Sequence, residues 1–485
     1  MVEMSMCLFS IAVFERDEKL KLKRKALEIS TSDIFVNDKL QRKESVKNVV
    51  ELLKNISSPV VFSVNAPWGA GKTTYLRMLH SSLKIESKKS IYFSAWETDF
   101  AEDPLVAFLG EMNVNICAFT GANSTKRKAW ENAKKAGAQI VKKVIPVAIK
   151  LATAGLIDAE KLLEEEASKL AEELSKDVIG SYTKNKQAIV DFKDNLAKIL
   201  VSDDGQAEKL YIFVDELDRC RPTYAIELLE RIKHLLDIEG LVFVLALDKG
   251  QLAHSVKAIY GSDFDAAGYL KRFIDVEFSL PPSDIEPYID YLADHFEFGD
   301  FFKASNNRDI ERQLPDLLSA IKVLARGQGM SLRTIEQLFA KIKLVLLSVP
   351  KGKYAYPELV VYLLFVKDSF PDVYSDFIKK DSDGEELIAL IDKVVVGGDD
   401  DVRYFKQDTQ ALIIACKFAM GADWSRTYVR NLRELAALET SSEDVSSHCR
   451  RVADLVHHYT SMGRGVPLDR IVSQINMVGN FNFDR

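Results

Sequence analysis

The chain has 485 residues, of which 47% are hydrophobic and 28% are charged. This is ordinary usage for a globular protein, and the length predicts roughly two to four domains. A core of that size needs no disulfide or metal to hold it together. The formal net charge of -7 argues against a protein that binds nucleic acid over its whole surface.

The cysteine pattern gives no metal or redox motif. The five cysteines are scattered and form no CxxC pair, so we expect reduced thiols in the cytoplasm. The apolar run "MSMCLFSIAVF" follows no basic region, and we expect an edge strand or packed arm there rather than a signal peptide. No stretch reaches the roughly 20 apolar residues of a membrane span.

Short apolar runs, rich in β-branched and aromatic residues, predict five strands at 59–64, 90–95, 209–214, 241–247 and 274–280. Strands buried on both faces of a parallel sheet have this composition. Helical patterns such as "YAIELLERIKHLL" lie between them. Strands that alternate with helices predict an α/β fold with a parallel sheet.

The helical pattern dominates elsewhere. The region from 105 to 199 is poor in strand signals and rich in Ala, Lys and Glu, so we interpret it as a helical insertion. After about 285 the patterns are helical. The expected domains are an N-terminal arm (1–30), an α/β core (31–104 and 200–285), the insertion (105–199), a helical lid (286–345) and a C-terminal helical domain (346–485).

The stretch "NAPWGAGKTT" follows the first strand and opens a helical pattern. It fits the phosphate-loop template G-x-x-x-x-G-K-[ST], except that Ala66 replaces the first glycine. In such a loop Gly71 lets the backbone approach phosphate, Lys72 reaches the β- and γ-phosphates, and Thr73 ligates magnesium. The alternative is a glycine-rich turn. The remaining predicted contacts come from Pro67, Trp68, Gly69, Ala70 and Thr74, although the template does not require a glycine at position 69.

An acidic pair ends the third predicted strand in "YIFVDELDRC". Residues at the carboxyl ends of strands line the ligand crevice of open α/β sheets. Asp215 is therefore expected to hold magnesium and Glu216 to polarise water as a general base, although acidic pairs also occur in plain turns. The strand at 90–95 separates the loop strand from the acidic strand in the sequence, as in P-loop proteins with an added central strand. After the fourth strand, Asp248 fits either a γ-phosphate sensor or a helix N-cap.

Four stretches resemble the KAP family of P-loop NTPases. They are "APWGAGKTTYL", "YFSAWETD", "VDELDRCRPTYAIELLERIKHLL" and "YLKRFIDVEFSLPPSD". The resemblance implies ATP binding and hydrolysis on a fold related to the AAA+ and STAND groups. It also implies a bacterial setting of anti-phage or mobile-element function, and some members carry membrane helices before the acidic motif.

The chain departs from the family at Ala66, at Glu216, where many members have aspartate, and in the insertion. Its best membrane candidate is "QIVKKVIPVAIKLATAGLI" (139–157), which three lysines and a proline interrupt, so we expect no transmembrane span. Soluble packed helices are the main interpretation. A basic membrane-surface helix and a nucleic-acid contact are the alternatives. Pairing of this basic segment with the acidic segment after it would neutralise both.

Several further charged residues have expected roles. By comparison with related NTPases, Arg42, together with Asp38, loosely fits the adenine pocket. Arg333 lies in the first turn of a helix that Ser331 is expected to cap, like the lid arginine of AAA+ relatives. Arg272 fits either a finger for a neighbouring subunit's γ-phosphate or a surface charge. Asp218 and Arg219 are expected to form a structural pair or a subunit contact.

The sequence thus predicts a cytoplasmic ATPase that binds ATP and Mg²⁺ and switches conformation or assembly. A homo-oligomer is expected, and an effector protein encoded nearby is a possible partner. One rival is a nucleotide-gated scaffold with little turnover that recruits such an effector. The other is a peripheral membrane organiser that uses the basic insertion.

Overall fold

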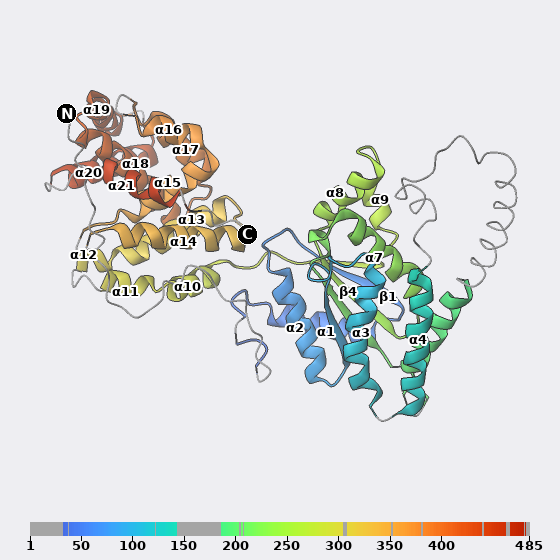
Figure 1. Ribbon diagram of the computed structural model, residues 1–485. Coiled ribbons are helices and arrows are strands. Elements are labelled where there is room, and N and C mark those ends of the chain that lie inside the picture. The colour runs from blue at the N-terminus through green and yellow to red at the C-terminus, as the bar shows by residue number, and fades with distance from the viewer. Residues whose placement is uncertain are drawn as a thin grey trace, which may run out of the picture. The chain divides into compact units, whose positions relative to one another are not determined.

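The chain folds into two compact units in a computed structural model (Figure 1). The first unit ends at Asp284, and the second runs from Ile285 onward. The structure describes residues 33–36, 38–121, 123–142, 186–202, 205–206, 208–303, 308–350, 353–379, 382–438, 441–461, 466–479 and 481. The predicted N-terminal arm lies outside these residues.

The first unit is built on a five-stranded parallel sheet with the order β2-β3-β4-β1-β5. Each strand lies close to its predicted run, and every residue of β3 and β4 is buried, as their apolar composition indicates. In the sheet, β4 separates the loop strand β1 from the acidic strand β3. The strands are β1 (Val60–Asn65), β2 (Lys89–Ser94), β3 (Leu210–Asp215), β4 (Leu241–Leu247) and β5 (Val276–Ser279).

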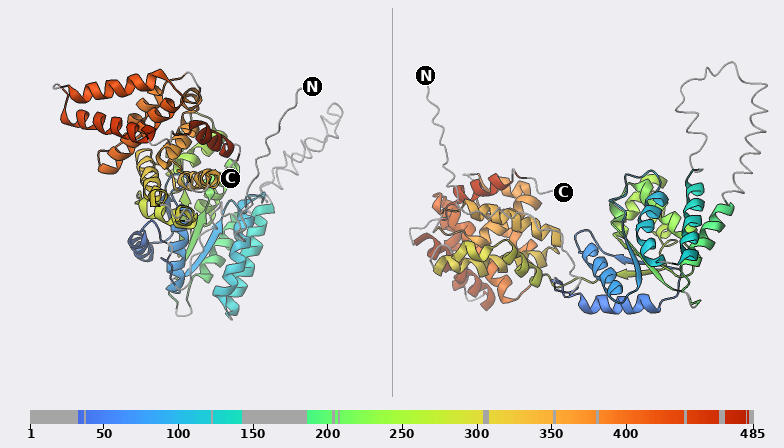
Figure 2. Two further views of the ribbon diagram at one scale, coloured as in Figure 1. Left: turned by 90° about the vertical axis from the view of Figure 1, so that its left-hand side faces the viewer. Right: turned by 60° about the horizontal axis from the view of Figure 1, so that its bottom comes forward.

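Helices cover both faces of this sheet, because successive strand residues point to opposite sides. On one face Tyr211 and Phe213 pack with α1 (Lys43–Asn55) and α2 (Lys72–Ile85). On the other face Ile212 and Val214 pack with the remaining helices. The right-hand view of Figure 2 shows α1 and α2, in blue, on their side of the sheet. The second face carries α3 (Pro104–Thr120), α4 (Ser124–Lys142), helical residues 186–199, α7 (Pro222–Leu235) and α8 (Lys249–Tyr260).

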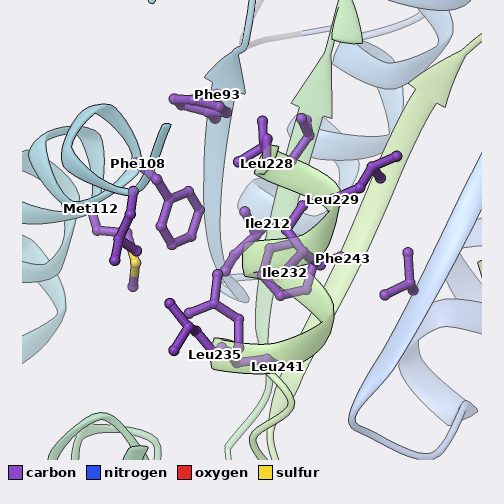
Figure 3. Packing of buried hydrophobic residues seen from close by; sticks show 14 of the residues in the cluster. Phe93, Phe108, Met112, Ile212, Leu228, Leu229, Ile232, Leu235, Leu241 and Phe243 are labelled. Atoms are coloured by element: carbon purple, nitrogen blue, oxygen red, sulfur yellow. The ribbon is translucent and has the colours of Figure 1, made fainter. Parts of the chain in front are cut away.

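The core of the second face is dense and apolar (Figure 3). Phe108 of α3 packs edge-on against Phe93 of β2 and tilts against Phe243 of β4. Leu229 and Ile232 of α7 lie in the same cluster. The described part of the predicted insertion therefore packs on the sheet and belongs to the core of this unit.

The remainder of the insertion, residues 143–185, lies outside the described residues. The expected pairing of basic and acidic helices falls there, as does most of the segment 139–157. Within the described residues, no helix is both long enough and apolar enough to cross a membrane.

The second unit is helical throughout its described residues, as expected. Helix α15 (Pro357–Ser369) is apolar on all sides and buried from Pro357 to Val366, so it lies at the centre of the unit. The other helices are α10 (Glu286–His295), α11 (Phe298–Lys303), α12 (Arg308–Glu311), α13 (Gln313–Gly327), α14 (Leu332–Ser348), α16 (Pro371–Phe377), α17 (Glu385–Val394), α18 (Asp400–Ala419), α19 (Asp423–Ala437), α20 (Glu443–Ser461) and α21 (Leu468–Val478).

Candidate nucleotide-binding site

The loop between β1 and α2 has the backbone of an anion-binding turn. Gly71 adopts the left-handed conformation at φ +83° and is the N-cap of α2. No side chain caps this helix end, and its first turn carries no acidic residue. The amide groups at the start of α2 therefore remain available to an anion, which the helix dipole also attracts.

Ala66 continues the sheet where the template has a glycine. Its amide donates to the carbonyl of Leu247 at 3.2 Å, and the φ angle of Ala66 is not positive. Gly69, in contrast, has φ +78°, a conformation that side chains rarely adopt. The template does not require a glycine at position 69, yet in this loop a left-handed residue lies there.

The Lys72 side chain folds back over its own loop. Its Nζ donates to the carbonyls of Ala66 at 2.7 Å and Pro67 at 3.3 Å. It also lies 3.4 Å from Oδ2 of Asp218, a side chain that is almost completely buried. The loop lysine and the segment that follows the acidic strand thus meet at one place, at the carboxyl edge of the sheet.

Asp215 is the buried last residue of β3. Its Oδ2 accepts a hydrogen bond from the Tyr92 hydroxyl, and its Oδ1 accepts from the amide of Glu216 at 2.9 Å. Burial and the neighbouring Asp215 carboxylate raise the pKa of Tyr92, so the phenol stays protonated and remains a donor. Tyr92 thereby fixes the orientation of the carboxylate.

Glu216 has an unusual backbone and two polar partners. It adopts the left-handed conformation at φ +61°, which is uncommon outside glycine and concentrates at functional sites. Ser94 donates to its Oε2 at 3.3 Å, and Arg219 lies 2.8 Å from its Oε1. Burial raises the pKa of Glu216, and Arg219 opposes that shift. The guanidinium of Arg219 also lies 5.8 Å from the centre of the Trp96 ring.

Asp248 joins the loop to the tip of β4. Its Oδ1 accepts from the amides of Gly250 at 3.0 Å and Gln251 at 3.2 Å, which makes it the N-cap of α8. Its Oδ2 accepts from the amide of Trp68 at 3.1 Å. The N-cap alternative is therefore observed, while the role as γ-phosphate sensor stays a prediction.

Arg42, which directly precedes α1, contacts the phosphate loop through its side chain. Its Nη2 donates to the carbonyl of Ala70 at 2.9 Å, and its Nε donates to Ser283 at 2.9 Å. Burial lowers the pKa of Arg42 to about 10, which leaves it charged at neutral pH. Its contacts are to the phosphate loop, and an adenine contact for Arg42 and Asp38 stays a prediction.

Three residues make contacts that hold this site together, although the sequence did not predict that role for them. Tyr92 orients Asp215, Asp218 contacts Lys72, and Arg219 contacts Glu216. Of the two alternatives for Asp218 and Arg219, a pair with each other is not observed, since Asp218 contacts Lys72 and Arg219 contacts Glu216. The subunit contact stays a prediction. The sequence "DELDRC" could have indicated these separate partners. It forms a one-turn helix, η1 (Leu217–Arg219), in which adjacent side chains point in different directions.

Two predicted residues lie outside this group. Arg272 follows the short helix α9 (Ala266–Leu270), is exposed, and precedes β5. Since β5 runs parallel to β1, the start of β5 and the phosphate loop lie at opposite edges of the sheet. Arg333 lies in the first turn of α14 in the second unit, where Ser331 caps the helix as expected by accepting from the Thr334 amide at 3.1 Å. The roles of both arginines stay predictions.

The donor set at the loop fits magnesium. Thr73 stands in the first turn of α2, and Asp215 offers a carboxylate, which are the oxygen ligands that this ion takes in nucleotide sites. Each Asp215 oxygen accepts one hydrogen bond and retains a second lone pair. Among the described residues, no group of three or more His, Cys, Asp or Glu side chains is arranged to hold a metal, so the proposed ligands are Thr73 and Asp215 together with the nucleotide's phosphates.

The parallel sheet, the phosphate loop after β1 and the acidic end of β3 together define a P-loop NTPase. A model of the KAP family P-loop domain matches residues 42–349. The chain belongs to the KAP family of P-loop NTPases.

The similarity to solved structures is weak. The ORC1 protein of Aeropyrum pernix in complex with DNA is 12% identical, with a TM-score of 0.30, and the match covers 90% of this chain and 92% of that one. AMPPCP-bound DnaA from Aquifex aeolicus is 13% identical, with a TM-score of 0.27, over 88% of this chain and 97% of that one. The comparison with curated proteins found no match.

Proposed function

We propose that this protein binds ATP with Mg²⁺ and hydrolyses it to switch its conformation or assembly. The observation that carries the proposal is the 3.4 Å contact between Lys72 and Asp218. It joins the phosphate loop to the turn that begins at Glu216. The residues that bind phosphate and the residue suited to activate water therefore share one site.

Each residue has a distinct task in this proposal. The amides at the start of α2 and the Lys72 ammonium hold the phosphates, while Thr73 and Asp215 hold Mg²⁺. The ion, when bound, neutralises charge on the phosphate oxygens. Glu216 accepts a proton from the attacking water, and its raised pKa favours a carboxylate that is basic enough for that task.

A second candidate is a scaffold that binds nucleotide but rarely hydrolyses it. It is favoured by the engagement of Glu216, whose Oε1 lies 2.8 Å from Arg219. The ion pair lowers the basicity that burial gives the Glu216 carboxylate and occupies one of its lone pairs. The same experiment separates the two candidates.

We expect steady-state phosphate release from ATP by wild type, and a decrease of about 10²- to 10⁴-fold in Glu216→Gln, because general-base catalysis contributes that much. Glu216→Gln should still bind ATP, whereas Lys72→Ala should bind weakly. Glu239→Gln is the matched control, since Glu239 is exposed and precedes β4 at the opposite edge of the sheet. Turnover in wild type that does not exceed turnover in Glu216→Gln rejects the enzyme and supports the scaffold.

We propose further that the switch acts in a homo-oligomer and reaches an effector protein. In that assembly Arg272 contacts the γ-phosphate of a neighbouring subunit, and the helical lid with Arg333 couples nucleotide state to the C-terminal helical domain. Defence against phage or mobile elements is the proposed output, and it rests on family resemblance alone. Phage plating on cells that carry wild type or Glu216→Gln tests this output.

A further inference from the structure

One carboxylate oxygen receives three donors from two other segments of the first unit. Oδ2 of Asp218 accepts from the indole Nε1 of Trp68 at 2.7 Å and from the amide of Asp248 at 2.9 Å. The Lys72 ammonium lies 3.4 Å from the same oxygen. Asp218 is 7% exposed, and a buried carboxylate requires such partners. It therefore ties η1 to the phosphate loop and to the tip of β4.

Trp68 is held at both its backbone and its ring. Its amide donates to Oδ2 of Asp248, and its indole donates to Asp218. The ring is nevertheless half exposed, so core packing does not explain its place on the loop. The two hydrogen bonds, together with the one between the Asp248 amide and Asp218, form a closed ring of contacts around the loop.

The Lys72 ammonium is fully engaged by the protein itself. An ammonium has three donors, and here they face the carbonyls of Ala66 and Pro67 and the carboxylate of Asp218. A phosphate group that binds Lys72 must displace one of these acceptors. Asp218 is the longest of the three contacts and the only charged one, so it is the direct electrostatic competitor of phosphate.

We propose that Asp218 is a positioning residue that shapes the empty phosphate loop through Trp68 and competes with phosphate for Lys72. This inference rests on the proposed nucleotide binding. When phosphate binds Lys72, the Asp218 carboxylate loses its contact with the ammonium. It keeps its hydrogen bonds to the Trp68 indole and the Asp248 amide, and these become its remaining polar contacts. Asp218 thus positions the loop before nucleotide binds and lowers the affinity of the loop for phosphate. The environment of Trp68 changes when nucleotide binds.

Asp218→Asn tests the competition, because the amide oxygen still accepts from Trp68 and Asp248 while the charge is removed. Calorimetric titration with ATP and Mg²⁺ should give a Kd about tenfold lower than wild type, since the substitution removes a negative charge that competes with phosphate for the Lys72 ammonium. Asp237→Asn is the matched control, since Asp237 is an exposed aspartate of the same unit. It should leave the Kd unchanged.

Trp68 fluorescence gives a readout that does not depend on turnover. Emission should change when ATP binds to wild type, and the part of the change that comes from Trp68 should be lost in Trp68→Phe, which removes the indole and its donor while the other three tryptophans remain. Asp218→Ala should shift the emission of the empty protein, because it breaks the bond to the indole, whereas Asp218→Asn should not. A cooperative melting transition of each Asp218 variant in the absence of ATP shows that both are folded.

The outcomes separate this inference from the proposed function. A Kd for Asp218→Asn equal to or higher than that of wild type overturns the competition, even if wild type hydrolyses ATP. Tighter binding by Asp218→Asn without phosphate release from any variant supports the competition and rejects only the hydrolysis. If neither protein binds ATP, nucleotide binding and the competition both fail.

Discussion

At the scale of single residues, the phosphate loop shows that a glycine requirement can move along a motif. Ala66 occupies the position of the template's first glycine, has a φ that is not positive and pairs with β4. Gly69 adopts the left-handed conformation at φ +78°. An alanine at position 69 must adopt a backbone conformation that costs about 1–2 kcal/mol. An alanine at position 66 has no such cost.

Gly69→Ala should therefore lower the free energy of unfolding by about 1–2 kcal/mol and weaken ATP binding, because the loop amides lose their alignment. Ala66→Gly should change the free energy of unfolding by less than about 1 kcal/mol. Chemical denaturation and ATP titration of both variants check this pair. Equal effects of the two substitutions would contradict the geometry.

At the scale of elements, two helices of the second unit bury carboxyl groups, and one of these groups raises the pKa of the other. Glu358 of α15 and Asp408 of α18 are 3% and 1% exposed. Tyr459 of α20 donates to Oδ1 of Asp408 at 2.9 Å, and Oδ2 of Asp408 has no hydrogen-bond partner. Burial and the neighbouring Asp408 and Asp316 carboxyls raise the pKa of Glu358, and burial raises that of Asp408 to about 6.

The sign of the pH effect follows from these shifts. A carboxyl whose pKa is raised by folding binds its proton more tightly in the folded state, so it stabilises the fold least when it is ionised. For Asp408 the loss of stability falls between its ordinary pKa of 3.8 and about 6. For Glu358 it begins as the pH rises through its ordinary value of 4.5.

Glu358→Gln should therefore match wild type near pH 4 and exceed its free energy of unfolding by about 1–3 kcal/mol at pH 7, because the amide carries no charge to bury. Denaturation of both proteins across this pH range measures the difference. Asp401→Asn is the control, since Asp401 is exposed on the same helix as Asp408. A difference that does not grow with pH would show that Glu358 is not the group responsible.

At the scale of the whole molecule, each unit has its own hydrophobic core. The first unit packs its helices on both faces of the sheet, and in the second Val452 and Val456 of α20 pack with Leu432 of α19. Two such units are expected to unfold in two steps when each core is self-sufficient. The phosphate loop belongs to the first unit alone.

ATP at about 100 times its Kd should stabilise the first unit by about 2.7 kcal/mol and raise its melting temperature by about 5–10 °C. The second transition should stay where it is. Differential scanning calorimetry with and without ATP measures both transitions, and Lys72→Ala should abolish the shift. A single transition that moves as a whole would instead show that the two units unfold together.

The sequence by itself determined the sheet, the phosphate loop and the acidic pair. Buried parallel strands are continuous apolar runs, and the groups that bind phosphate occupy fixed positions relative to the end of a strand. The strands and the phosphate-binding residues can therefore both be predicted from the local sequence pattern. For the same reason the helix after Ser331 and the helical second unit were predictable.

Only the tertiary structure decided which side chains meet at the site. Tyr92 reaches Asp215 because β2 and β3 are neighbours in the sheet, although 123 positions separate them in the chain. Asp218 reaches Trp68 across 150 positions. Such contacts depend on strand order and on the direction of each side chain, which local composition does not encode. The same physics placed the left-handed turn at Gly69, since Ala66 is held in the ladder by β4.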